Sequence, residues 1–84
     1  MTDQGGTPPN ADQTLDCKGM LCPLPVVKVS KAIKEIDVGQ VLLLLATDPG
    51  SRPDMAAWTK RTGNPLVHED QDGNVFRFWI QREA

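Results

Sequence analysis

The chain has 84 residues and a net charge of −2; 39% of the residues are hydrophobic and two are cysteine. That length predicts a single domain with a thin core, for which two layers of secondary structure are favoured over three. The longest apolar run spans residues 41–46, far short of a membrane helix, and residues 1–13 lack the pattern of a signal peptide. The acidic balance argues against a dedicated nucleic-acid binder, and two cysteines without a secretion signal predict a protein of the reducing cytoplasm.

Residues 1–12 contain glycine and proline pairs and few apolar side chains, so we expect a flexible tail followed by one domain over residues 13–84. A short alternation of polar and apolar residues predicts the first strand, and apolar residues at three- and four-residue spacings predict an amphipathic helix. A continuous apolar run predicts a central strand buried on both sides, and an Asp-Gly turn predicts a C-terminal hairpin. The predicted elements are strand 14–17, a helix from Pro23 that ends before residues 37–39, strand 41–46, helix 52–62, and strands 66–70 and 75–81.

The order β-α-β-α-β-β predicts an α/β fold of the α+β type, a two-layer sandwich with a four-stranded mixed sheet. Two helices are too few to cover both faces of this sheet, so we expect both on one face and the other face partly open. In the last strand Trp79 alternates with Phe76 and Phe78, which places it on the open face. It is either an exposed aromatic available to a partner or a side chain covered by its neighbour Leu43 or Leu45. Ser51 and Asp54 fit the capping-box pattern, which makes Asp54 a helix-capping carboxylate.

Cys22 is the candidate for chemistry, because it directly precedes a predicted helix in the sequence Cys22-Pro23-Leu24-Pro25. Only the thiolate is a strong nucleophile, and a helix N-cap lowers the pKa of a thiol through unpaired N–H groups and the positive end of the helix dipole. Pro23 and Pro25 stiffen the first turn but remove two N–H donors, which weakens this field. The alternative interpretation is a small cysteine buried at a helix start.

Cys17, five residues earlier, also has two interpretations. It is either a resolving thiol that forms a disulfide with Cys22 or a filler at the end of the first strand; its flanking residues favour the filler, because none would activate it. No metal site is expected, since two cysteines separated by four residues and a single histidine do not supply a zinc site. His68 is accordingly predicted to be a surface residue.

Lys28, Lys31 and Lys34 recur at three-residue spacing on the predicted first helix. Such a stripe is either a docking surface for an acidic protein or a polyanion such as RNA, or a solvated helix face, which is the commoner case. The candidate docking residues are Lys28, Lys31, Asp54 and Trp79.

The combination of Asp16, Gly19 and Cys22-Pro23-Leu24-Pro25, followed by Val26-Val27-Lys28, resembles the TusA/SirA-like sulfur-carrier family with its Cys-Pro-x-Pro motif. The resemblance covers residues 14–82 and implies a two-layer βαβαββ sandwich in which Cys22 is the catalytic residue. Asp16, Gly19, Pro23 and Pro25 would support the motif. Further similar positions are 48–51, Asp54, Trp58 and 63–64.

The resemblance implies a sulfur relay in which Cys22 accepts a sulfane sulfur as a persulfide and passes it to an acceptor protein. The donor would be a cysteine desulfurase or a rhodanese-like protein, and no cofactor is implied beyond the covalent persulfide. Such carriers serve tRNA thiolation, molybdenum-cofactor and sulfur-oxidation pathways. Two hypotheses stay open beside it: a thiol–disulfide redox module that uses Cys17 and Cys22, and a non-catalytic RNA- or protein-interaction module. Neither membrane binding nor primary nucleic-acid binding is expected.

Overall fold

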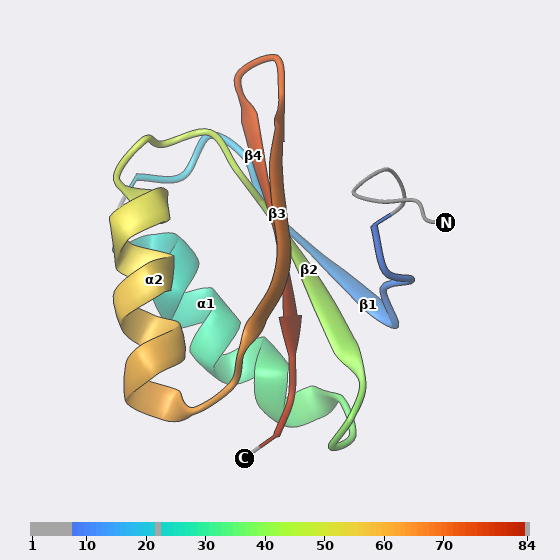
Figure 1. Ribbon diagram of the computed structural model, residues 1–84. Helices are drawn as coiled ribbons and strands as arrows, with labels where there is room; N and C mark the ends of the chain where they lie inside the picture. The colour runs from blue at the N-terminus through green and yellow to red at the C-terminus, as the bar shows by residue number, and fades with distance from the viewer. Residues whose placement is uncertain (1–7, 22, 84) are drawn as a thin grey trace.

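The computed structural model describes residues 8–21 and 23–83, and within them a four-stranded sheet carries two α-helices on one of its faces (Figure 1). The strand order is β1-β2-β4-β3; β1 is parallel to β2, and the other neighbours are antiparallel. The predicted two-layer βαβαββ fold with a mixed sheet is confirmed. The elements are β1 Gln13–Cys17, α1 Leu24–Ala32, the 3₁₀ helix η1 Ile33–Glu35, β2 Val41–Ala46, α2 Ser51–Thr62, β3 Leu66–Asp72 and β4 Val75–Gln81.

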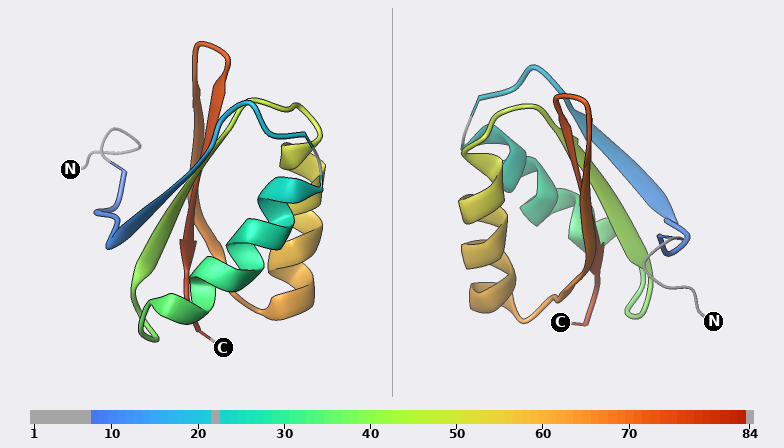
Figure 2. Two further views of the ribbon diagram at one scale, coloured as in Figure 1. Left: turned by 180° about the vertical axis from the view of Figure 1, so that it is seen from behind. Right: turned by 45° about the horizontal axis from the view of Figure 1, so that its top comes forward.

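The hydrophobic core lies between the helices and the sheet face that they cover. Leu44 of β2 pairs with Phe78 of β4, and both side chains are fully buried in one cluster with Trp58 of α2. On the other face of β2, Leu43 and Leu45 are only half-buried. The prediction that this strand is buried on both sides is therefore wrong in part, because no helix covers its second face (Figure 2).

Helix α1 begins one residue later than predicted and ends in a tighter turn. Pro23 is the N-cap residue instead of the first helical residue, and its carbonyl accepts the N–H of Val27 at 3.2 Å. The helix continues into η1 and stops before Gly39, whose φ of 95° lies in the region that glycine tolerates best. None of the helices among the described residues is long and apolar enough to span a membrane.

The capping box predicted at the start of α2 does not form. Gly50 is the N-cap residue, and the buried Ser51 hydroxyl donates to the carbonyl of Asp48 at 2.7 Å. A buried hydroxyl needs an acceptor, and this carbonyl lies within the same turn. Asp54 does lie in the first turn of α2, where a carboxylate interacts favourably with the helix dipole.

The C-terminal hairpin is present, with a tighter turn than predicted. Asp72 pairs with Val75, which leaves Gly73 and Asn74 as a two-residue loop. Only Gly73 has a positive φ, 63°, as in type II′ turns.

The predicted tail over residues 1–12 is described from residue 8 onward. Asp12 donates its N–H to the carbonyl of Val41, and its Oδ2 accepts the N–H of Val41, both at 2.8 Å. Asp12 is thus tied to the start of β2 instead of belonging to a free tail. Residues 1–7 lie outside the described residues.

Candidate functional site

The predicted motif lies in the loop between β1 and α1, at one end of the helical layer. Cys22 itself lies outside the described residues. Both helices begin at this end, where the parallel strands β1 and β2 finish (Figures 1 and 2). The two loops that follow these strands are joined, because the N–H of Gly19 donates to Thr47 Oγ1 at 2.9 Å. Thr47 is a structural partner of the motif that the sequence analysis missed, and no local pattern marks it.

Asp16 and Gly19 shape the turn that leads from β1 toward position 22. Asp16 Oδ1 accepts the N–H of Lys18 at 2.9 Å, and its Oδ2 lies 3.5 Å from Lys18 Nζ. The backbone hydrogen bond, helped by the ammonium charge, holds the pKa of the Asp16 carboxyl below its ordinary value. Gly19 has a φ of 83°, and the N–H of Met20 returns to the carbonyl of Cys17 at 3.1 Å. Asp16 and Gly19, which the family resemblance predicts to support the motif, thus form the turn that precedes it.

The two motif prolines build the first turn of α1. Pro25 is fully buried beneath the helix start, whereas Pro23 is exposed. The N–H of Leu24 donates to the carbonyl of Leu21 at 2.9 Å, and Pro25 has no N–H to offer. The first turn is therefore stiff, and it retains few N–H donors for an anion.

Exposed apolar side chains flank the motif cysteine in the sequence. Leu21 is 72% exposed, Leu24 51% and Val27 49%. Leu24 and Val27 are three residues apart on one helix face and lie off the buried stripe of α1. We call these three residues the apolar rim. None of the predictions from sequence included it, although these apolar residues lie outside the predicted core stripe of the helix and are a signal for such a surface.

Cys17 is fully buried in the core at the end of β1. Burial raises the pKa of its thiol and outweighs the opposing effect of the Lys28 charge. A neutral thiol enclosed by apolar side chains is a poor nucleophile. The burial of Cys17 therefore argues against the resolving role considered for it and favours the interpretation as a filler at the end of β1.

Trp79 is not an exposed contact residue, and that prediction is wrong: its side chain is only 3% exposed. Polar groups cover it on the face without helices. The His68 ring meets it edge-on at a centroid distance of 4.9 Å, and the Arg77 guanidinium carbon lies 5.2 Å from the Trp79 centroid. Asp70 binds Arg77 through two hydrogen bonds of 2.6 Å, and His68 Nε2 lies 3.8 Å from Asp70 Oδ2. We call His68, Asp70, Arg77 and Trp79 the open-face cluster.

The lysines predicted for docking are exposed, and they border a shallow groove beside the edge strand β1. Lys28 and Lys31 line this groove of about 170 Å³ together with Gln13 and Glu35. Gln13 Nε2 donates to Glu35 Oε1 at 3.3 Å across it. Asp54 lies on α2, outside this groove, so the four candidate docking residues do not form one surface.

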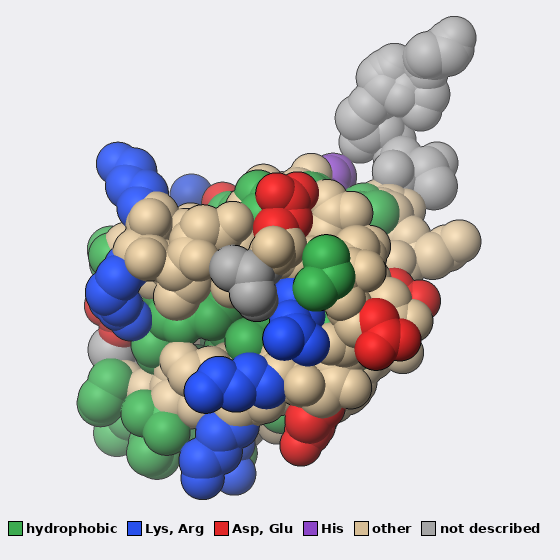
Figure 3. Space-filling model, turned by 90° about the horizontal axis from the view of Figure 1, so that it is seen from below, with side chains coloured by type: hydrophobic (Ala, Val, Ile, Leu, Met, Phe, Trp, Pro, Cys, Tyr) green, Lys and Arg blue, Asp and Glu red, His purple; other side chains and the backbone are tan. Residues whose placement is uncertain are grey.

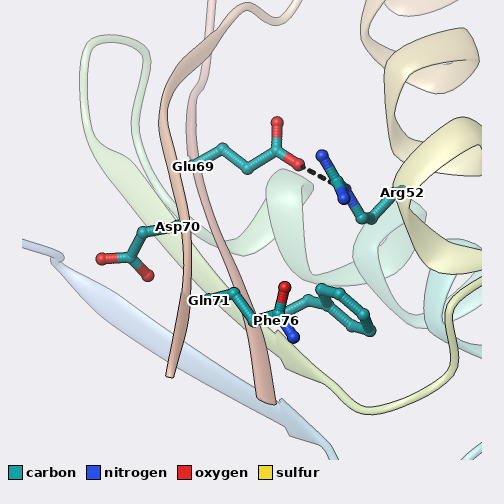
Figure 4. Close-up of a pocket in the computed structure, with 5 residues that line it drawn as sticks. All are labelled: Arg52, Glu69, Asp70, Gln71 and Phe76. Carbon is teal, nitrogen blue, oxygen red and sulfur yellow. Dashed lines mark hydrogen bonds and ion pairs between the residues drawn. The ribbon is translucent and has the colours of Figure 1, made fainter. Parts of the chain in front are cut away.

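A hollow of about 240 Å³ lies between α2 and the β3–β4 hairpin (Figure 4). Glu69 and Arg52 point toward each other across it and form an ion pair of 3.3 Å, whereas Asp70 points to the other side of β3. In residues 8–21 and 23–83, no three His, Cys, Asp or Glu side chains are grouped so that they could hold a metal ion.

Comparison with known proteins decides the family. The family model described as sulfurtransferase TusA matches residues 13–82, which include the whole sheet and both helices. The chain belongs to the TusA sulfurtransferase family. This result confirms the resemblance seen in the sequence and assigns the protein a role in sulfur transfer.

Individual relatives and a solved structure agree with this family. The chain is 44% identical over 71 residues to the sulfur carrier protein TusA of Allochromatium vinosum, covering 84% of this chain and 93% of the relative. It is 34% identical over 73 residues to the sulfur carrier protein TusA of Pseudomonas entomophila, covering 87% and 91% respectively. Its fold is similar to that of the SirA-like protein from Desulfitobacterium hafniense, with a TM-score of 0.74, 26% identity and coverage of 86% of this chain and 99% of that one.

Proposed function

We propose that this member of the TusA family carries sulfane sulfur as a persulfide on Cys22. The observation that supports the proposal is the environment of the other thiol. Cys17 is fully buried, whereas Leu21 and Leu24, which flank position 22 in the sequence, are 72% and 51% exposed. Since Cys17 is enclosed in the core, the proposal assigns the exchange to Cys22, the other cysteine of the chain. The burial of Cys17 also argues against the dithiol redox hypothesis.

The proposed step is a sulfur transfer that needs no external oxidant or reductant. The Cys22 thiolate attacks the terminal sulfur of a persulfide on a donor protein. The sulfur–sulfur bond of the donor breaks, a new one forms on Cys22, and the donor leaves as a thiolate. An acceptor thiolate then repeats the attack on the Cys22 persulfide. Position 22 directly precedes the N-cap residue Pro23, so in this proposal the positive end of the α1 dipole favours the anionic forms of the thiol and the persulfide, although the two prolines leave few N–H donors there. The proposed step involves no bound cofactor.

The apolar rim is the contact that we assign to the donor and acceptor proteins. Leu21, Leu24 and Val27 present apolar area beside the proposed site, and burying it on contact favours association. Three side chains form a small contact, which suits a carrier that must release each partner. A cysteine desulfurase or a rhodanese-like protein is the proposed donor class. The acceptor pathway (tRNA thiolation, molybdenum-cofactor maturation or sulfur oxidation) and a location in the reducing cytoplasm stay predictions.

Persulfide loading tests the proposal directly. The full chain is incubated with a cysteine desulfurase and cysteine, and intact mass is measured before and after reduction. We expect one added sulfur atom that reduction removes, no loading of Cys22→Ser, and loading of the matched control Cys17→Ala at the wild-type level. Loading of Cys22→Ser, or its loss in a folded Cys17→Ala protein, would show that the site assignment is wrong.

A further inference from the structure

The helical layer carries a charge opposite to that of the whole protein. The segments α1, η1 and α2 contain six Lys or Arg residues and two Asp or Glu residues, a net charge of +4, whereas the entire chain has a net charge of −2. Elsewhere, Arg77 pairs with Asp70 and Lys18 with Asp16. The unbalanced positive charge is therefore a property of the helices and not of the composition.

A groove between the C-terminal halves of the two helices is the place where this charge meets a hollow surface. The groove has a volume of about 460 Å³. Figure 3 shows this end of the molecule, where Lys and Arg side chains stand around a depression with hydrophobic side chains in it. We call this the interhelical groove. Its lining residues are Ser30, Ile33, Lys34, Trp58, Arg61, Thr62 and Asn64.

The polar groups in the floor of the groove already have partners within the protein. Trp58 Nε1 donates to Ser30 Oγ at 2.9 Å, which ties the two helices together beneath the groove. Thr62 Oγ1 donates to the carbonyl of Trp58 at 2.9 Å, and Asn64 Oδ1 accepts the N–H of Glu83 at 2.8 Å. The floor is consequently a preformed surface that does not require an added hydrogen-bonding ligand.

The two cations on the rim, by contrast, are exposed and unneutralised. Lys34 comes from η1 and Arg61 from α2, so they stand on opposite helical segments. Neither side chain takes part in the pairs Lys18–Asp16, Arg52–Glu69, His68–Asp70 or Arg77–Asp70. No acidic side chain lines the groove within the described part of the chain. The groove thus has a partly apolar floor, to which buried Ile33 contributes, and two exposed cationic side chains on its rim that can pair with anionic groups of a ligand.

We propose that the interhelical groove binds an acidic segment of a partner protein, one that carries an apolar side chain between carboxylates. The apolar side chain would contact the small part of Ile33 that stays accessible at the floor (4% exposed), and the carboxylates, which carry most of the recognition, would pair with Lys34 and Arg61. A peptide fits better than RNA, because Trp58 is only 1% exposed and offers no aromatic face on which a base could stack.

The groove lies at the opposite end of α1 from the apolar rim. Lys34 is ten residues beyond Leu24, which corresponds to roughly 15 Å along a helix axis. A partner held in the groove therefore leaves the rim accessible, so binding here goes beyond the proposed sulfur transfer and does not depend on Cys22.

Titration of the ¹⁵N-labelled chain with a blocked peptide of alternating Glu-Glu-Leu units tests this proposal. We expect shifts of the Trp58 indole N–H and of the backbone amides of Ser30, Lys34 and Thr62. The Trp79 indole, on the other face of the sheet, is an internal control that stays unchanged. The peptide with Gln in place of Glu should bind at least about tenfold more weakly, because the carboxylates supply the pairing with the rim cations.

Charge reversal separates this groove from general attraction. Lys34→Glu with Arg61→Glu should weaken binding by about tenfold or more. The matched control Lys28→Glu with Lys60→Glu makes the same change in net charge on α1 and α2, at residues that do not line the groove, and should weaken binding by less than about threefold. If the reversed chain does not fold, Lys34→Gln with Arg61→Gln replaces it. Equal losses in both pairs, no shifts at about 1 mM peptide, or tighter binding of single-stranded RNA of equal charge in the same groove would each overturn the proposal. The persulfide proposal would stand in all three cases.

Discussion

The two faces of the sheet each bury one tryptophan, but they do so by different means. On the helix-covered face, Trp58 is 1% exposed within an apolar cluster that includes Met55 and Phe78. On the other face, Trp79 is 3% exposed beneath the ring of His68 and the guanidinium of Arg77. Nearly equal burial therefore conceals a difference between apolar packing and a polar cover.

This difference shows that the buried fraction of a side chain does not by itself predict how much that side chain stabilises the fold, or under which conditions. Apolar packing depends weakly on pH and salt, whereas ion pairs between partly exposed groups depend on both. The helix-covered face also supports the motif loop, since Cys17 and Pro25 are buried at the two ends of that loop. The open-face cluster, by contrast, links only the two strands of the hairpin, β3 and β4, on the face of the sheet that no helix covers. Substitutions at Trp58, Trp79, Cys17 and Asp70 test this contrast.

The largest effect is expected from truncating the two tryptophans in turn. Trp58→Ala should lower the free energy of unfolding by about 3–5 kcal/mol, because it removes a fully packed ring from the core. Trp79→Ala should cost about 2 kcal/mol, because flexible polar side chains can close over the space and water can enter. Urea unfolding measures both. If Trp58→Ala does not fold, Trp58→Phe, which loses the hydrogen bond to Ser30, serves instead. An equal or larger loss for Trp79→Ala would show that the open face is a second core.

A smaller effect is expected at the buried thiol. Cys17→Ser should lower the free energy of unfolding by about 1–2 kcal/mol, because a hydroxyl replaces a thiol that is 0% exposed, and Cys17→Ala should cost less. Because burial raises the pKa of Cys17, the unfolded chain ionises first as pH rises above about 8.5. The stability of the wild type should then fall relative to Cys17→Ala over that pH range, as measured by urea midpoints. Iodoacetamide gives a second check in a Cys22→Ser background. Equal labelling rates in buffer and in urea would mean that Cys17 is not protected.

The smallest effect is expected at the open-face cluster. Arg77 holds the pKa of the Asp70 carboxyl below its ordinary value through its hydrogen bonds and charge. The stabilisation is thus present above about pH 4, where the unfolded carboxyl ionises, and is lost as the pH falls through the lower pKa of the folded protein. Asp70→Asn should reduce the urea midpoint at pH 6 and leave it unchanged near pH 2. The control Asp72→Asn on the same strand, whose charge also acts on Arg77 but without a hydrogen bond to it, should reduce the midpoint at pH 6 by less than Asp70→Asn does. A loss that persists at acid pH would assign Asp70 a packing role.

The order and type of the elements could be predicted because their signals are local. Residues 41–46 form an apolar run of strand length, and the Phe76–Ile80 alternation marks the last strand. The predictions were wrong at the starts of the two helices, where a polar group has more than one possible local partner. The Ser51 hydroxyl donates to the carbonyl of Asp48 instead of capping α2, and the carbonyl of Pro23 accepts the N–H of Val27, which makes Pro23 the N-cap residue. Such choices depend on turn geometry, which periodicity does not encode.

The candidate site could be predicted in part for the same reason. Asp16, Gly19, Pro23 and Pro25 lie within ten residues of one another, so the turn and the start of α1 to within one residue follow from the motif itself. Thr47 could not be found this way, because its hydrogen bond to Gly19 joins loops that are 28 residues apart.

A linear pattern was enough to establish the βαβαββ order and the motif that marks this family, since both are written in neighbouring residues. It did not reveal that Trp79 is covered or that Lys34 and Arg61 share the interhelical groove. Those properties arise when folding brings distant segments together: Arg77 reaches Asp70 across a strand pair, and Trp58 reaches Ser30 between two helices. Burial and charge are set by neighbours in space, and the chain acquires those neighbours only when the helices pack on the sheet.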